Sequence, residues 1–226
     1  MYVDNSINNF MSYLIKQDIP LVFIHIPKTA GNAIITSLSK DYKIKHIPND
    51  RSLNKNYHST LIDAENFLSS INDPLVFTVV RNPWDRISSW FFFRRNILRL
   101  SLKNFEKSVN RLKVVDNVSI IKDEYELMAT DFNKWLLTYY NQPWDNTWFS
   151  LNHPQSYWIK GDKFKVSKII RYENLQKDIK FLNVELPITN QSKKDISNYK
   201  DLYTDNTKKF IAKIYEEDID NFKYLF

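Results

Sequence analysis

Two short apolar runs constrain the fold of this chain most strongly, because each leads through a charged loop into a helical pattern. "LVFIHI" (21–26) lies between Pro20 and Pro27, and "PLVFTVV" (74–80) ends just before Arg81. An apolar run without polar alternation is typical of a strand buried on both faces, as in a parallel sheet. "KIIRY" (168–172) is a weaker third run of the same kind. The three runs predict a buried sheet at the centre of the molecule.

Helical patterns lie between and after these runs, at 31–40, 60–70, 83–97, 123–140, 173–182 and 204–218. Strands that alternate with helices predict an α/β fold around a mostly parallel sheet. The chain has no internal repeat and no linker, so we expect one domain over residues 1–226. Such sheets bind ligands at the carboxyl ends of their strands. The loop that follows each apolar run is therefore a candidate site.

Composition narrows the class of ligand and the compartment. The formal net charge of +6 favours anionic ligands, but no block of like charges suggests a nucleic-acid-binding tail. The absence of cysteine excludes disulfides, thiolate nucleophiles and cysteine-ligated metals, and it suits a reducing compartment. The four histidines lack the spacing of a metal site, so we expect no metal. With neither a membrane-spanning apolar segment nor a signal peptide, we expect a cytoplasmic protein.

The loop after the first run carries one of the two glycines of the chain, next to a lysine. A helix N-terminus attracts anions, Lys28 adds a positive charge, and Gly31 allows a ligand to approach the backbone closely. The candidate anion-binding residues are Pro27, Lys28, Thr29, Ala30, Gly31, Asn32 and Ala33. The loop is not a nucleoside-triphosphate P-loop, because its lysine precedes its only glycine. The alternative is a tight connection whose lysine points to solvent.

The segment "TVVRNPWDRISSWFFF" (78–93) repeats this arrangement of strand, charged residue and helix. Asn82 suits a helix N-cap, Pro83 suits the first helical position, and Asp85 suggests a capping box. Arg81 leaves the strand and can reach the same space as Ser89 on the helix. An arginine and a hydroxyl beside a helix start can bind phosphate. The alternative is an ordinary capped helix whose arginines form surface ion pairs.

Taken together, "FIHIPKTAGN" and "FTVVRNPWDRISSW" resemble the carbohydrate-type sulfotransferase family, which uses 3′-phosphoadenosine 5′-phosphosulfate (PAPS). Further segments are similar to that family, so the resemblance covers nearly all of the chain from residue 21: "HPQSYW" (153–158), "IIRYENLQKDI" (169–179) and "YTDNTKKFIAKIYEEDIDNFKY" (203–224). It implies a P-loop-like three-layer fold, with a central sheet between helices. It also implies a nucleotide donor, a saccharide hydroxyl as acceptor and 3′-phosphoadenosine 5′-phosphate (PAP) as product.

The resemblance assigns a role to each candidate residue. Lys28 would meet the bridging and 5′-phosphate oxygens of PAPS, and the rest of the first loop would hold the 5′-phosphate. Arg81 and Ser89 would hold the 3′-phosphate. The chain departs from the family at Asn32 and Ala33, where a threonine or serine is common after the glycine. It also lacks the N-terminal membrane anchor of the eukaryotic Golgi members, which implies a bacterial, cytoplasmic member.

The acceptor hydroxyl must lose its proton, and histidine is the usual base near neutral pH. His25 lies inside the first predicted strand, where a core role is expected, and His46 could end a further strand. His58, between the two motifs, is similar to a histidine of the family in that interval, so we predict it as the general base. His153 is the second candidate, and a carboxylate base stays open.

Two other functions are compatible with parts of the pattern. A nucleotide or small-molecule kinase with an altered phosphate loop would also need anion sites, although the chain lacks the Walker sequence. A basic binding module for nucleic acid or acidic glycan would need no paired strand–loop–helix sites. The aromatic residues between 135 and 158 could line a glycan cleft, but side chains of this type more often form core.

Overall fold

The computed structural model describes residues 13–16, 20–47, 59–108, 116–140, 153–182, 186 and 198–226. Its centre is a five-stranded sheet in the order β3-β1-β2-β4-β5. The strands are β1 (Tyr13–Lys16), β2 (Leu21–Ile24), β3 (Lys43–His46), β4 (Leu75–Val80) and β5 (Lys168–Arg171). β2 pairs with β4, and β4 with β5, in parallel, whereas β1 is antiparallel to both β2 and β3.

The three predicted apolar runs are the three parallel strands, which confirms the predicted α/β class. β4 lies between its two parallel neighbours, and its last five residues are buried. β3 ends at His46, as the sequence suggested, but β1 was not predicted. Its four residues, "YLIK", are too few for a periodic pattern that would distinguish a short strand from a loop.

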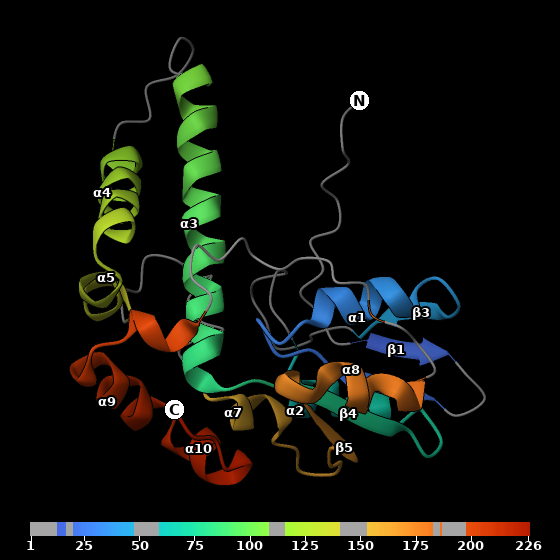
Figure 1. The fold of residues 1–226 in the computed structure, drawn as a ribbon. Helices are drawn as coiled ribbons and strands as arrows, with labels where there is room; N and C mark the ends of the chain where they lie inside the picture. Colours follow the sequence, from blue (N-terminus) through green and yellow to red (C-terminus); the bar gives the residue numbers. More distant parts are fainter. Residues whose placement is uncertain are drawn as a thin grey trace.

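Helices cover both faces of the sheet, so the fold has three layers (Figure 1). On one face, α1 (Gly31–Leu38) and α8 (Leu175–Asp178) pack on Phe23, Phe77 and Ile170. On the other face, α2 (Leu61–Leu68) packs on Val22, Ile24 and Val76. Alternate residues of β2 thus enter the two core clusters, because successive side chains of a strand point to opposite faces.

A helical lobe lies beside the sheet and is built on α3 (Pro83–Ser108), which rises directly from the end of β4 (Figure 1). Its other helices are α4 (Asp116–Thr130), α5 (Phe132–Tyr139) and α9 (Asp205–Ile214), with the short turn η4 (Tyr199–Leu202). Their shared core is rich in aromatic side chains, among them Trp84, Phe91 and Trp135. α7 (Gln155–Ile159) and α10 (Glu216–Phe222) lie under the start of α3.

Several helix boundaries differ from the sequence prediction. α3 continues to Ser108 instead of ending at 97, and the helix expected over 123–140 is two helices. Asp131 causes that break: its backbone is extended, and its carboxylate accepts the backbone N–H of Lys134 as an N-cap. The helix expected over 204–218 is likewise α9 and α10, divided at Tyr215. The segment 173–182 forms α8 between two 3₁₀ turns, η2 (Tyr172–Asn174) and η3 (Ile179–Leu182).

The aromatic residues between 135 and 158 were predicted to form either core or a glycan cleft. Trp135, Tyr140 and Trp158 are buried in the core. Trp144 and Trp148 lie outside the described residues. The core role of these aromatics is therefore established for the three buried ones.

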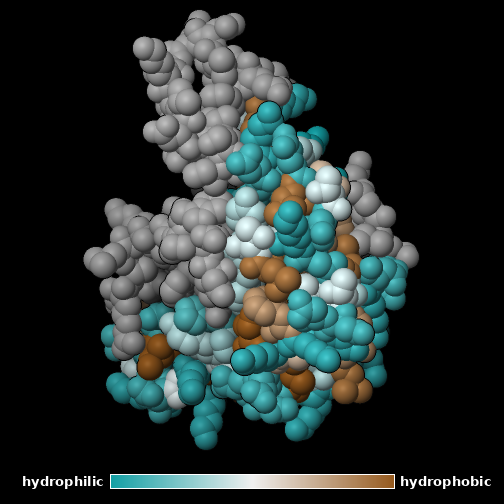
Figure 2. All heavy atoms as spheres, turned by 90° about the vertical axis from the view of Figure 1, so that its left-hand side faces the viewer, coloured by the Kyte–Doolittle hydropathy of each residue, from teal (hydrophilic) through white to brown (hydrophobic). Residues whose placement is uncertain are grey.

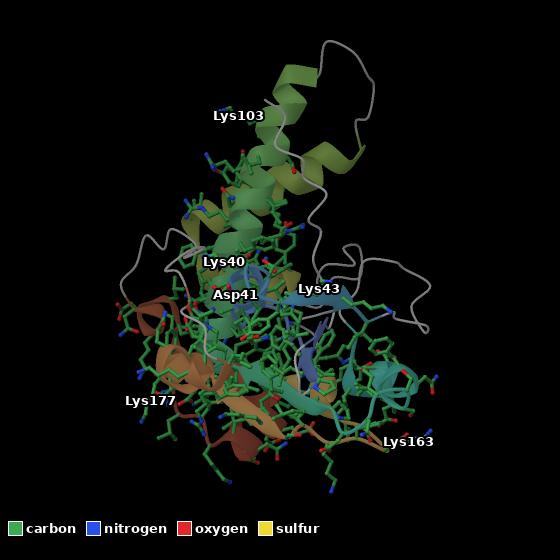
Figure 3. All side chains as sticks on the ribbon, turned by 90° about the vertical axis from the view of Figure 1, so that its right-hand side faces the viewer. Lys40, Asp41, Lys43, Lys103, Lys163 and Lys177 are labelled. Atoms are coloured by element: carbon green, nitrogen blue, oxygen red, sulfur yellow. The ribbon has the colours of Figure 1, made fainter. Side chains whose placement is uncertain are left out.

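The coloured part of the face shown in Figure 2 is largely hydrophilic. On the face shown in Figure 2, hydrophobic side chains form separate patches among hydrophilic ones. Lys103 on α3, Lys177 on α8 and Lys163 between α7 and β5 lie well apart in Figure 3. Among the described residues, no helix is long and apolar enough to cross a membrane.

Candidate active site

The loop between β2 and α1 has a backbone shape suited to anions. Lys28 and Ala30 have positive φ angles of 71° and 70°, whereas Thr29 between them does not. Left-handed residues in such a turn can direct successive backbone N–H groups towards one point, as in anion-binding nests. The buried Thr29 hydroxyl donates to the carbonyl oxygen of Ile26 at 2.8 Å and thereby fixes the turn. This shape supports the predicted anion-binding role of the loop.

Gly31 is required here for a reason that the sequence did not reveal. A Cβ atom at this position would lie 1.9 Å from Nε2 of His25 and 2.0 Å from its Cδ2. His25 is buried and stacks on Phe23, with 5.5 Å between the ring centroids. The helix start therefore lies directly on an imidazole ring, which confirms the core role expected for His25. Gly31 itself does not have a positive φ.

Arg81 joins the second motif to the first. Its Nη1 donates to the carbonyl oxygen of Lys28 at 3.1 Å, so the ends of β2 and β4 meet at one edge of the sheet. Its Nε and Nη2 each lie 2.7 Å from Oδ2 of Asp85. The guanidinium also lies over the ring of Tyr172, 3.9 Å from its centroid. Arg81 therefore lies against the loop that follows β2.

The N-terminus of α3 has the expected N-cap residue but not the expected capping box. Asn82 is the cap, because its Oδ1 accepts the backbone N–H of Trp84 at 3.1 Å. The capping box suggested for Asp85 is wrong, since that carboxylate holds Arg81. A guanidinium with two donors in reach binds a carboxylate more strongly than a single backbone N–H does.

Lys28 is only partly exposed, and its ammonium group lies over the ring of Phe93, 3.9 Å from the centroid. Burial, and secondarily the charge of Arg81, lower the pKa of Lys28 from 10.5 to about 7. An anion bound near Lys28 and Arg81 would offset both effects on the pKa, because a nearby negative charge favours the protonated lysine. Without an anion, the cation–π contact with Phe93 holds the protonated lysine in place.

Arg86 is a structural support of the site that the sequence analysis did not single out. It is fully buried, and its Nε donates to the carbonyl oxygen of Pro27 at 3.0 Å. Its Nη1 reaches the carbonyl oxygen of His153 at 3.4 Å. One guanidinium therefore fixes both the first loop and the segment that carries the second candidate base.

The other predicted residues differ in accessibility. The Asn32 side chain is exposed at the first turn of α1, whereas Ala33 is buried in the core-facing surface of that helix. Ser89 is buried on α3. Asn32 can therefore reach a ligand with its side chain, while Ala33 offers only its backbone.

The predicted base His58 lies outside the described residues. The second candidate, His153, is partly exposed and stacks on Tyr157 with 4.2 Å between ring centroids. Burial, followed by the charge of Arg86, lowers the pKa of His153 and so favours its neutral imidazole. Within the described ranges, no three side chains of His, Cys, Asp or Glu gather in a group able to hold a metal ion.

Comparison with known proteins identifies the chain at the family level. No curated protein and no solved structure matches it. A family model described as the sulfotransferase family matches residues 11–225, which is nearly the whole chain and includes both anion motifs. The chain therefore belongs to the sulfotransferase family, whose members transfer sulfuryl groups.

Proposed function

We propose that this protein transfers the sulfuryl group of PAPS to a hydroxyl group of a saccharide. The observation that carries this proposal is the contact between Arg81 and the backbone of Lys28, which joins two candidate anion sites at one edge of the sheet. A donor with phosphates at both its 5′ and 3′ positions needs two such sites. The saccharide acceptor follows from the resemblance to carbohydrate-type sulfotransferases.

In this proposal each residue has a distinct role. The donor supplies a sulfuryl group on its 5′-phosphate. Lys28 neutralises the charge that develops on the 5′-phosphate oxygen as its bond to sulfur breaks. Backbone N–H groups at residues 28–32 hold the 5′-phosphate. Arg81 and Ser89 hold the 3′-phosphate. The acceptor oxygen forms the new bond to sulfur, and its proton passes to a general base.

The donor assignment is tested by calorimetric titration with PAP, adenosine 5′-phosphate and ATP. We expect the wild-type protein to prefer PAP, and Arg81→Ala to weaken that preference about 10- to 100-fold, because one or two charge-assisted hydrogen bonds are lost. Arg94→Ala is the matched control. It removes a different buried arginine, which lies on α3 and pairs with Glu124 at 2.8 Å, so it should lower stability and keep the preference. A wild-type preference for ATP would instead support a kinase.

The base is identified by comparing His58→Ala with His153→Ala in single-turnover transfer assays. We expect His58→Ala to abolish transfer while PAP binding stays within about twofold, because a general base contributes about 10²–10⁴-fold to rate. His153→Ala should retain most of its transfer rate, since the backbone carbonyl by which Arg86 holds this segment is kept in the variant. The reverse order of effects would move the base to His153.

A further inference from the structure

The end of β4 needs support that neither the sheet nor α3 supplies. The ladder between β4 and β5 ends with the pair Val80 and Arg171, and α3 begins at Pro83. The buried Arg81 lies between these elements, so its backbone N–H and carbonyl need other partners. The position of its guanidinium depends on what holds this backbone.

The side-chain amide of Gln155 provides both partners. Its Oε1 accepts the N–H of Arg81 at 2.8 Å, and its Nε2 donates to the carbonyl oxygen of Arg81 at 2.8 Å. The two bonds reproduce the pairing of a neighbouring strand at a residue that has none there. Gln155 is 0% exposed, so water does not compete for these bonds.

Asp218 fixes the orientation of that amide. Its Oδ2 accepts from the backbone N–H of Gln155 at 2.6 Å and from Nε2 of the same residue at 3.2 Å. Its Oδ1 accepts the N–H of Ser156 at 2.8 Å, and the carboxylate is 0% exposed. Both hydrogens of Nε2 therefore have acceptors, and a flipped amide would place an oxygen against the carboxylate. The unit of Gln155 and Asp218 has one stable arrangement.

We propose that Gln155, held by Asp218, is a positioning residue for Arg81 and thereby sets the preference of the protein for a 3′-phosphorylated nucleotide. This inference rests on the proposed function. The side chain of Arg81 contacts Asp85, Tyr172 and the Lys28 backbone, so its backbone position decides which of its donors reach a ligand. Displacements of about 1 Å are enough to weaken such recognition strongly.

Glu173 makes the expected effect partial. Its Oε1 accepts the N–H of Asn82 at 2.6 Å, which holds the residue after Arg81 independently of Gln155. Loss of the Gln155 amide should therefore loosen Arg81 without releasing the whole strand end. A graded loss of the 3′-phosphate preference is the consequence.

The test is the ratio of affinities for PAP and adenosine 5′-phosphate in Gln155→Met, a substitution that keeps the side-chain size. We expect the affinity for PAP to fall about tenfold, as two hydrogen bonds are lost, while that for adenosine 5′-phosphate changes less than about twofold. Asp218→Asn keeps the Gln155 amide but disturbs the carboxylate that supports it. The affinity ratio of this variant should therefore lie between those of the wild type and Gln155→Met. Asp218→Asn also replaces Gln155→Met if that variant does not fold.

Glu65→Gln is the control for a purely structural loss. Glu65 is a buried carboxylate that accepts the N–H groups of Lys163 and Phe164 at 2.7 and 3.1 Å, with no described bond to Arg81. It should lower the melting temperature and leave the affinity ratio unchanged. An unchanged ratio in Gln155→Met, or an equal fall in Glu65→Gln, overturns the positioning role alone. A wild-type protein without preference for PAP overturns the proposed function and this inference with it.

Discussion

Gly31→Ala is expected to lower the free energy of unfolding by about 3 kcal/mol, which is a large effect for one added methyl group. The new Cβ would lie 1.9 Å from the ring of His25, which is buried and stacks on Phe23, so the ring or α1 must shift against packed neighbours. The shift of α1 needed to relieve the contact should also weaken PAP binding. Urea denaturation measures the loss directly.

A double-mutant cycle with His25→Ala shows whether the contact is the cause. Removal of the imidazole makes room for the methyl group, so the double variant should be more stable than the sum of the single effects by about 2 kcal/mol. Thr36→Ala, an exposed substitution on the same helix, is the control and should change stability by less than about 0.5 kcal/mol. Additive effects of Gly31→Ala and His25→Ala would contradict this explanation.

Lys28→Met is expected to lower the transfer rate by about 10²–10³-fold or more, since it removes a charge aimed at the leaving oxygen. The binding of PAP should also couple to protonation of Lys28. The pKa of Lys28 in the free protein is about 7, and contact with phosphate oxygens would raise it towards its usual value of 10.5. Between these values the free lysine is mostly neutral and the bound lysine is charged, so binding takes up nearly one proton. Affinity should therefore fall about tenfold per pH unit above pH 7.

Calorimetry at pH 8.5 in two buffers of different ionisation enthalpy measures this proton uptake. Lys28→Arg is the matched variant, because arginine stays charged and should bind PAP without taking up a proton. Equal uptake by the wild type and Lys28→Arg would assign the proton to another group. A flat pH dependence of the wild-type affinity would show that Lys28 does not contact the ligand.

The sequence was sufficient to predict the parallel strands and to locate the two loops that follow β2 and β4, because continuous apolar runs and the residues that follow them are local signals. It was insufficient for the contacts that shape the site. Gly31 was expected to admit a ligand, yet its nearest neighbour is His25, a contact made only when the loop folds back. Asp85 was expected to cap a helix, but Arg81 takes its carboxylate.

The sequence could not predict the side chains that hold the backbone of Arg81 and Asn82 for the same reason. Gln155 and Glu173 lie far along the chain from the strand end that they hold. The sequence did hold a weak signal for Glu173. This residue follows the apolar run 168–172 directly, just as Arg81 follows the apolar run 74–80. Parallel strands bring such positions to one edge of the sheet.

The position of the helical lobe in the chain has a consequence for folding. α3, α4, α5 and α7 all lie between β4 and β5 in sequence, although these two strands are neighbours in the sheet. Until β5 arrives, "LVFTVV" is an unprotected edge strand, rich in β-branched residues and without charge. A growing or truncated chain that ends before residue 168 exposes this edge to other copies, so we expect it to aggregate.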